Sequence, residues 1–169
     1  MSTNNIVYSG DVTITTVRKK FHLHNTGGES LFRLLTTILC REVYSVDELP
    51  TYIMMFARES SDVLSTPNFM TTDASSCSEL ADYVPVIAYT EKDGNDVHSS
   101  VFTASFVATN IRGGASSHSL ALVSGDRKNI IAAVDMNENV VGALNQGQQS
   151  IVKWKMKIYN DTSGGTSNA

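Results

Sequence analysis

The sequence predicts a mainly β protein, an antiparallel β-sandwich or jelly roll with one short α-helix near the N-terminus. In several segments apolar and polar residues alternate, which is the pattern of strands that bury one face. Turn-forming residues interrupt the chain roughly every 8 to 12 residues, as they do in sandwiches and barrels. Helical segments do not alternate with the strand segments, which argues against a parallel α/β fold.

The clearest strand is the segment SIVKWKMKIYN at residues 150–160. Successive side chains of a strand point to opposite faces, so this segment separates into an apolar and a basic side. The apolar side holds Val152, Trp154, Met156 and Ile158, and the basic side holds Ile151, Lys153, Lys155, Lys157 and Tyr159. We expect this segment to be the closing strand of an antiparallel sheet, with the only tryptophan in the core and three lysines in water.

A helix is predicted over residues 29–42. Leucine and isoleucine recur there at helical spacing, at Leu31, Leu34, Leu35, Ile38 and Leu39. The other strands are expected at residues 11–24 (with a bulge or bend at Thr15 and Thr16), 83–90, 97–109, 118–124, 130–135 and 140–144. Residues 51–58 are apolar on both sides; we interpret them as a strand, with a buried helix as the alternative.

The chain is expected to form one domain with loose ends. Its 169 residues suffice for a core without disulfides or metals. We expect residues 1–10 to be a flexible N-terminal arm, residues 11–160 to be a single β-sandwich domain, and residues 161–169 to be a disordered tail. Residues 59–81 form a long predicted loop, of the kind that is often functional or interface-forming.

Composition excludes several classes of function. The net charge is −4 and only 18% of residues are charged, which predicts no strong attraction to nucleic acid. Cys40 and Cys77 are far apart and lack zinc-ligand spacing, so we expect free thiols in a reducing compartment, with Cys40 packed in the helix and unreactive. The sequence shows no signal peptide and no apolar run near the roughly 20 residues that span a bilayer, which predicts a soluble protein made in a cytoplasm.

Two histidines give the strongest metal-site pattern. His22 and His24 are two residues apart in a predicted strand, so their side chains lie on the same face, and His98 or His118 would supply a third ligand. The favoured interpretation is nevertheless a solvated strand face. No Ser-His-Asp or Cys-His arrangement is evident in the sequence, and we expect no enzyme activity and no cofactor.

Two turn segments resemble ion sites more weakly. The oxygens of residues 93–96 (DGND) are compatible with calcium, but the spacing differs from that of an EF-hand and Asp-Gly is first a turn signal. Gly113 and Gly114 are compatible with an anion, but no helix and no Lys-Ser/Thr pair follow them. We interpret both segments as ordinary loops.

The three lysines of the final strand form a basic stripe about 14 Å long, at about 3.4 Å per residue. Only Tyr159 shares their face among the aromatic residues of that strand, so a stacking platform for nucleic acid is poorly supported. We favour the interpretation that the lysines protect an exposed sheet edge from pairing, with contact to an acidic protein as the next choice.

Three stretches together resemble small structural proteins of tailed bacteriophages. They are a basic strand leading into GGESLFRLL (27–35), the turn GDRKN with IIAAVD (125–135), and GQQSIVKWKMKIYN (147–160). The resemblance extends over about residues 18–160. It implies a non-enzymatic virion component, made in the host cytoplasm, which would be a capsid accessory, neck or tail-associated protein present in several symmetric copies. The implied partners are copies of itself and other virion proteins; no site residue carries over.

The leading hypothesis is therefore a structural protein that acts by symmetric subunit packing, with no membrane contact and no small-molecule substrate. The expected partner-contact residues are Lys153, Lys155, Lys157, Phe69, Met70, Gly113 and Gly114. The alternative is a carbohydrate- or ligand-binding sandwich that uses exposed tyrosines. Candidates for that role are Tyr8, Tyr44, Tyr52, Tyr83, Tyr89 and Tyr159. A third possibility is a small metal-dependent enzyme that uses His22 and His24.

Overall fold

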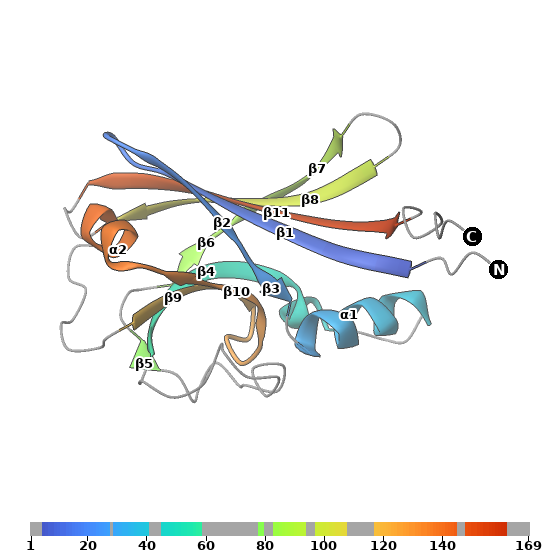
Figure 1. Ribbon diagram of the computed structural model, residues 1–169. Coiled ribbons are helices and arrows are strands. Elements are labelled where there is room, and N and C mark those ends of the chain that lie inside the picture. Colours follow the sequence, from blue (N-terminus) through green and yellow to red (C-terminus); the bar gives the residue numbers. More distant parts are fainter. Residues whose placement is uncertain are drawn as a thin grey trace, which may run out of the picture.

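Two antiparallel β-sheets pack face to face in the computed structural model of the chain (Figure 1), which confirms the predicted sandwich-like, mainly β fold. The structure describes residues 5–27, 29–40, 45–58, 78–79, 83–93, 97–107, 117–144 and 148–161. The five-stranded sheet has the order β2 (Lys20–His24), β1 (Asn5–Thr15), β11 (Gln149–Asp161), β8 (Val97–Val107) and β7 (Ile87–Asp93). The six-stranded sheet has the order β3 (Thr26–Gly27), β10 (Ile130–Met136), β9 (Ser117–Ser124), β4 (Pro50–Arg58) and β5 (Ser78–Glu79), with β6 (Val84–Pro85) also paired to β4.

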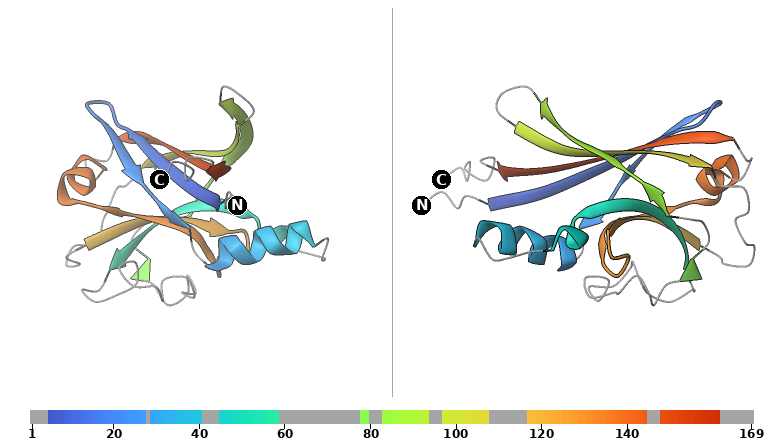
Figure 2. Two further views of the ribbon diagram at one scale, coloured as in Figure 1. Left: turned by 45° about the vertical axis from the view of Figure 1, so that its right-hand side comes forward. Right: turned by 180° about the vertical axis from the view of Figure 1, so that it is seen from behind.

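Short helices lie at the two ends of the sandwich. Figures 1 and 2 place α1 (Glu29–Leu39) at the end where β1 begins, and α2 (Glu138–Leu144) at the opposite end. The predicted helix is confirmed as α1; Leu31 and Leu34 are buried, whereas Ile38 is exposed. A short 3-10 helix, η1 (Val46–Glu48), precedes β4.

The first and last strands of the fold pair with each other. β1 pairs with β11 along its whole length, from Asn5 opposite Asp161 to Thr15 opposite Ile151. The expected loose arm over residues 1–10 is therefore wrong for residues 5–10, and Asp161 belongs to a strand rather than to the tail. Residues 1–4 and 162–169 lie outside the described residues.

Two predicted strands are each divided in the structure. Residues 11–24 form the end of β1 and all of β2, which are joined by a turn in which the Thr16 N–H donates to the Lys19 carbonyl at 2.8 Å. The change of phase at Thr15 and Thr16, which we attributed to a bulge or a bend, is this turn. Residues 83–90 likewise contain β6 and the start of β7, which belong to different sheets. The chain crosses between the sheets at Val86, whose N–H donates to the Thr51 carbonyl at 3.0 Å.

The predicted strand over residues 140–144 is wrong, because these residues belong to α2. Asn137 caps this helix: its side-chain oxygen accepts a hydrogen bond from the Val140 N–H at 3.1 Å. Val140 and Leu144 are four residues apart and both buried, so one face of the helix packs on the core. The cap and this packing outweigh the preference of valine for strands.

The other predicted strands are confirmed with small changes in their ends. β4 settles residues 51–58 as a strand, and β8, β9 and β10 correspond to the segments predicted at 97–109, 118–124 and 130–135. Within the predicted 59–81 loop, Ser78–Glu79 forms β5, and the rest lies outside the described residues. Cys40 is exposed, so the expectation of a packed thiol is wrong.

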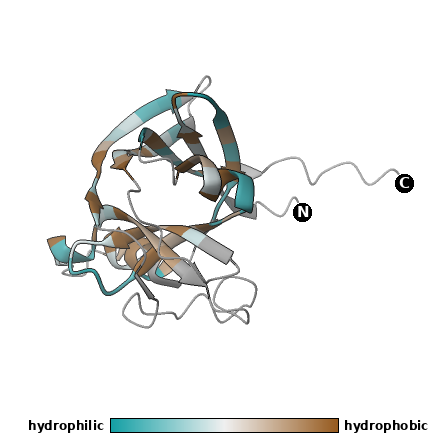
Figure 3. Ribbon diagram, turned by 90° about the vertical axis from the view of Figure 1, so that its left-hand side faces the viewer, coloured by the Kyte–Doolittle hydropathy of each residue, from teal (hydrophilic) through white to brown (hydrophobic). Residues whose placement is uncertain are grey.

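The main core lies between the two sheets. In the central strands of the five-stranded sheet, every second side chain points into this core. These side chains include Val12, Phe102, Val152 and Trp154, all at most 7% exposed. Figure 3 views the sandwich from the α2 end and shows hydrophilic and hydrophobic bands alternating along strands of this sheet.

The six-stranded sheet is apolar on both faces. Ile53 and Met55 belong to the main core, and Met54 and Phe56 of the same strand belong to a second buried cluster on the opposite face. The second cluster consists of Met54, Phe56, Ala121, Val123, Ile130 and Ala133. Burial on both faces explains why the sequence of β4 is apolar at every position from 53 to 56.

A buried polar cluster joins Tyr8, Gly10, Asn25 and Trp154. With the Asn25 amide oriented so that its nitrogen faces the Gly10 carbonyl, that nitrogen donates to the carbonyl at 2.7 Å. The amide oxygen then accepts from the Tyr8 hydroxyl at 3.0 Å and from the indole N–H of Trp154. Asn25 stands between β2 and β3, where the chain passes from one sheet to the other. The cluster therefore fixes this crossing.

Tyr8 makes the stability of the protein sensitive to alkaline pH. Burial raises the pKa of Tyr8 to about 12, whereas an unfolded tyrosine titrates near 10. The unfolded chain therefore loses its proton first, and stability that is fully present below pH 10 is lost as the pH rises towards 12. We expect Tyr8 to lower the free energy of unfolding by about 1 kcal/mol between pH 8 and pH 11. Urea titrations of wild type and Tyr8→Phe at both pH values measure this; equal pH slopes would contradict it.

Candidate functional site

The outer face of the five-stranded sheet is the candidate site, because it carries the predicted lysines and histidines together. Strand register places the outward residues in rows that cross all five strands. One row contains Ile87, Thr103, Lys153, Thr13 and His22. The next row contains Tyr89, Val101, Lys155, Asp11 and His24. The resulting face combines cationic, hydroxyl and apolar side chains.

Glu91 of β7 binds two of the lysines. Its carboxylate accepts a hydrogen bond from the Lys153 ammonium at 3.0 Å and from the Lys155 ammonium at 2.7 Å. The hydrogen bond from Lys155, followed by that from Lys153, lowers the pKa of Glu91. The hydrogen bond to Glu91 raises the pKa of Lys153. The carboxylate and both ammonium groups are therefore charged at neutral pH, and the three form one ionic cluster.

The lysine side chains lie across the sheet and cover β8. Their exposed fractions are 38% for Lys153 and 19% for Lys155, so the expectation of lysines standing in water is wrong. Val101 lies opposite Lys155 in register and is fully buried, although it belongs to the outer face. The aliphatic stems of long charged side chains shield apolar neighbours in this way.

Edge protection does not explain the lysine stripe. β11 is the central strand of its sheet, with β1 on one side and β8 on the other. Sequence alone did not reveal this position, because a last strand can lie at an edge or between two earlier strands. The interpretation of the lysines as protection for an exposed edge is therefore wrong.

The two histidines of β2 are bound to neighbours on β1. The Nδ1 atom of His24 lies 2.7 Å from Oδ1 of Asp11, and Nδ1 of His22 lies 3.2 Å from Oγ1 of Thr13. Within the described part of the chain, no three His, Cys, Asp or Glu side chains are placed to hold a metal ion. Of the two histidines predicted as a third ligand, His98 lies on the opposite face of β8 from Val101. The side chain of His118 lies outside the described residues.

Several predicted contact residues are not described by the structure. Phe69, Met70, Gly113 and Gly114 lie outside the described residues, as do Tyr44 and residues 94–96 of the DGND turn. The tyrosines proposed for ligand binding separate into different environments. Tyr89 and Tyr159 are exposed on the outer face of the five-stranded sheet, and Tyr8 belongs to the buried polar cluster.

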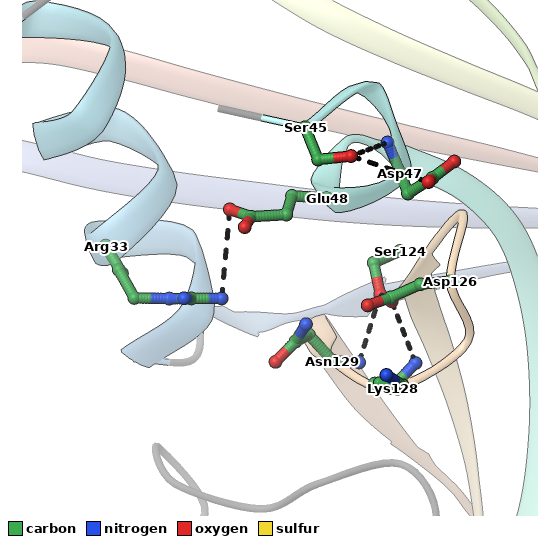
Figure 4. A network of polar contacts seen from close by, with 8 residues as sticks. All are labelled: Arg33, Ser45, Asp47, Glu48, Ser124, Asp126, Lys128 and Asn129. Carbon is green, nitrogen blue, oxygen red and sulfur yellow. Dashed lines mark hydrogen bonds and ion pairs between the residues drawn. The ribbon is translucent and has the colours of Figure 1, made fainter. Parts of the chain in front are cut away.

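The GDRKN turn is part of a structural network (Figure 4). Asp126 accepts hydrogen bonds from the Ser124 hydroxyl and, at 3.0 Å, from the Lys128 N–H. Burial raises the pKa of Asp126. The hydrogen bonds from Ser124 and Lys128 together lower this pKa by more than burial raises it, so the pKa of Asp126 lies below its usual value. The Asp126 N–H donates to the Asp47 carbonyl at 2.9 Å, which ties the β9–β10 turn to η1.

Arg127 completes this turn and packs on aromatic rings. Its φ of 61° lies in the left-handed region, which lets the turn close between β9 and β10. Its guanidinium carbon lies 5.0 Å from the ring centroid of Tyr52 and 4.4 Å from that of Tyr83. These contacts hold the two tyrosines in place and make them poor candidates for ligand stacking.

Among the described residues, five large hydrophobic side chains are exposed on the outer face of the five-stranded sheet. They are Ile87 (73%), Tyr89 (44%), Val107 (47%), Ile151 (50%) and Tyr159 (38%). Sequence reasoning missed Ile87 because residues 83–90 were treated as one strand. The alternation of β11 did place Ile151 among the lysines.

No protein-family model, curated protein or solved structure matches this chain. In the part of the chain that the structure describes, no helix is long and apolar enough to cross a membrane.

Proposed function

We propose that this protein is a non-enzymatic structural subunit of a bacteriophage virion, a capsid accessory, neck or tail-associated protein that packs against copies of itself and other virion proteins. The observation that carries the proposal is the outer face of the five-stranded sheet. Exposed apolar residues such as Ile151 and Ile87 lie there beside lysines that already have an ionic partner in Glu91. The phage context comes from the sequence resemblance.

The ionic cluster lowers the free-energy cost of burying this face in a protein contact. An isolated ammonium group loses its hydration when a partner covers it, which is costly unless it is paired. Lys153 and Lys155 keep the Glu91 carboxylate as a partner when water is removed. The low charged fraction of the chain, 18%, also suits subunit packing, because interface cores are depleted in charged residues.

Light scattering after size-exclusion chromatography, over a concentration series, tests this proposal. We expect a closed oligomer whose fraction increases with protein concentration. Lys153→Glu with Lys155→Glu, which places three like charges together, should shift the equilibrium towards smaller species. A monomer at every concentration would contradict self-packing.

A carbohydrate-binding module is the second candidate, and exposed aromatic residues favour it. Tyr89 and Tyr159 present 44% and 38% of their surface on one sheet face. Trp154, the aromatic residue with the largest face, is fully buried and unavailable to a sugar. Titration of tyrosine fluorescence with glycans separates the two candidates, because only a binding module gives a saturable change.

A further inference from the structure

Three of the four sheet edges are protected in familiar ways. A strand at a sheet edge presents unpaired N–H and C=O groups, which proteins protect with short strands or charged side chains. β3 and β5, at the edges of the six-stranded sheet, have two residues each. β2, at one edge of the five-stranded sheet, has five residues, and its exposed side chains are Lys20, His22 and His24.

β7 is the exception. It has seven residues and pairs only with β8 among the described strands. Ile87, Ala88, Tyr89 and Thr90 are all exposed, so this part of the strand is open on both faces. Figures 1 and 2 show β7 running away from the six-stranded sheet, which explains why the side chains on its inward face are exposed. The charged residues of β7 are confined to its last three positions, Glu91, Lys92 and Asp93, so residues 87–90 leave a partly apolar edge that is a template for strand addition.

We propose that a second copy of this chain adds its own β7 to this edge, antiparallel and about a two-fold axis at Tyr89, which joins two five-stranded sheets into one. This inference deepens the proposed function and rests on it. The ladder begins at Ile87, because the N–H of Val86 is already bonded to Thr51 of the other sheet. With the axis at Tyr89, residues 87–91 of the two copies pair.

This register is self-complementary. Tyr89 of each copy faces its counterpart, and aromatic pairs across strands are favourable. Ala88 lies opposite Thr90 of the other copy, so two small side chains meet on the inward side. Ile87 lies opposite Glu91, whose charge is already balanced by Lys153 and Lys155 of its own chain. Shifting the axis to Thr90 would instead oppose Ala88 with the charged Lys92.

A charged substitution on the edge provides the first test. Tyr89→Lys should raise the dimer dissociation constant roughly tenfold or more, because the two substituted lysines would lie directly opposite each other at the two-fold axis. The matched control is Val17→Lys, at a residue that is 73% exposed but lies in the β1–β2 turn. It should leave the dissociation constant unchanged. Light scattering over a concentration series measures all three proteins, and circular dichroism checks that they are folded.

Covalent capture tests the register. In a chain with Cys40→Ser and Cys77→Ser, Tyr89→Cys should form a disulfide dimer on mild oxidation. Directly opposed residues of an antiparallel pair have Cα atoms about 4.5–5.5 Å apart, which is disulfide distance. Val17→Cys in the same background should give only collisional cross-linking.

The outcomes separate this inference from the proposed function. An oligomer that persists in the Tyr89→Lys protein would overturn the β7 contact while leaving a self-packing subunit in place. Equal cross-linking at positions 17 and 89 would also overturn it. A wild-type chain that stays monomeric at every concentration would overturn both the inference and self-packing.

Discussion

Replacing Trp154 by alanine should lower the free energy of unfolding by about 3–5 kcal/mol. Trp154 is fully buried and lies in the central strand of the five-stranded sheet, opposite Val12 on one side and Phe102 on the other. Alanine would leave a cavity between these neighbours and remove the N–H that binds Asn25. Urea unfolding followed by circular dichroism measures the loss.

The control lies on the opposite face of the same strand. Ile151 is 50% exposed, and Ile151→Ala should change the free energy of unfolding by no more than about 0.5 kcal/mol. Trp154→Phe is an intermediate case, because it keeps a six-membered ring in the core but removes the five-membered ring with its N–H donor, at a cost of about 1–3 kcal/mol. Equal losses for Trp154→Ala and Ile151→Ala would contradict the central position of the tryptophan.

The elements that were predicted correctly are those whose formation depends on the spacing of apolar residues within one segment. The alternation in β11 correctly placed Val152, Trp154 and Met156 in the core, because a strand with one buried face must alternate, but it was wrong for Ile158, which is 45% exposed. The leucine spacing in α1 predicted the helix for the same kind of reason. The main features of the fold, two packed antiparallel sheets with a helix near the N-terminus, follow from such segments.

Features that depend on distant residues were not predictable in this way. The sequence does not indicate that β11 inserts between β1 and β8, and this position decides what its lysines do. The partner of Lys153 and Lys155 is Glu91, about sixty residues earlier in the chain. The positions at which the chain crosses between the sheets were not predictable either. The crossing at Asn25 depends on a contact with Trp154, which lies far along the chain.

Gly10→Ala should lower the free energy of unfolding by about 2–4 kcal/mol although it adds a single methyl group. A Cβ atom at position 10 would overlap the amide group of Asn25, which lies directly against this glycine. The Asn25 side chain would have to withdraw, and the Tyr8 hydroxyl and the Trp154 N–H would lose their common partner. The Gly10 carbonyl would lose the bond from the Asn25 amide and keep the one from the Asn25 backbone N–H. Buried polar groups without a partner are costly, and the crossing between the sheets would loosen.

Gly142→Ala is the matched control, because a Cβ atom there meets nothing within 4 Å and the residue lies in α2. Alanine should stabilise that helix by about 0.5–1 kcal/mol, so the two glycine substitutions are expected to have opposite signs. Asn25→Ala removes the group that the new methyl would strike. The double variant Gly10→Ala, Asn25→Ala should therefore lose less stability than the sum of the single losses. Strict additivity in this cycle, measured by urea unfolding, would show that position 10 is constrained by something other than Asn25.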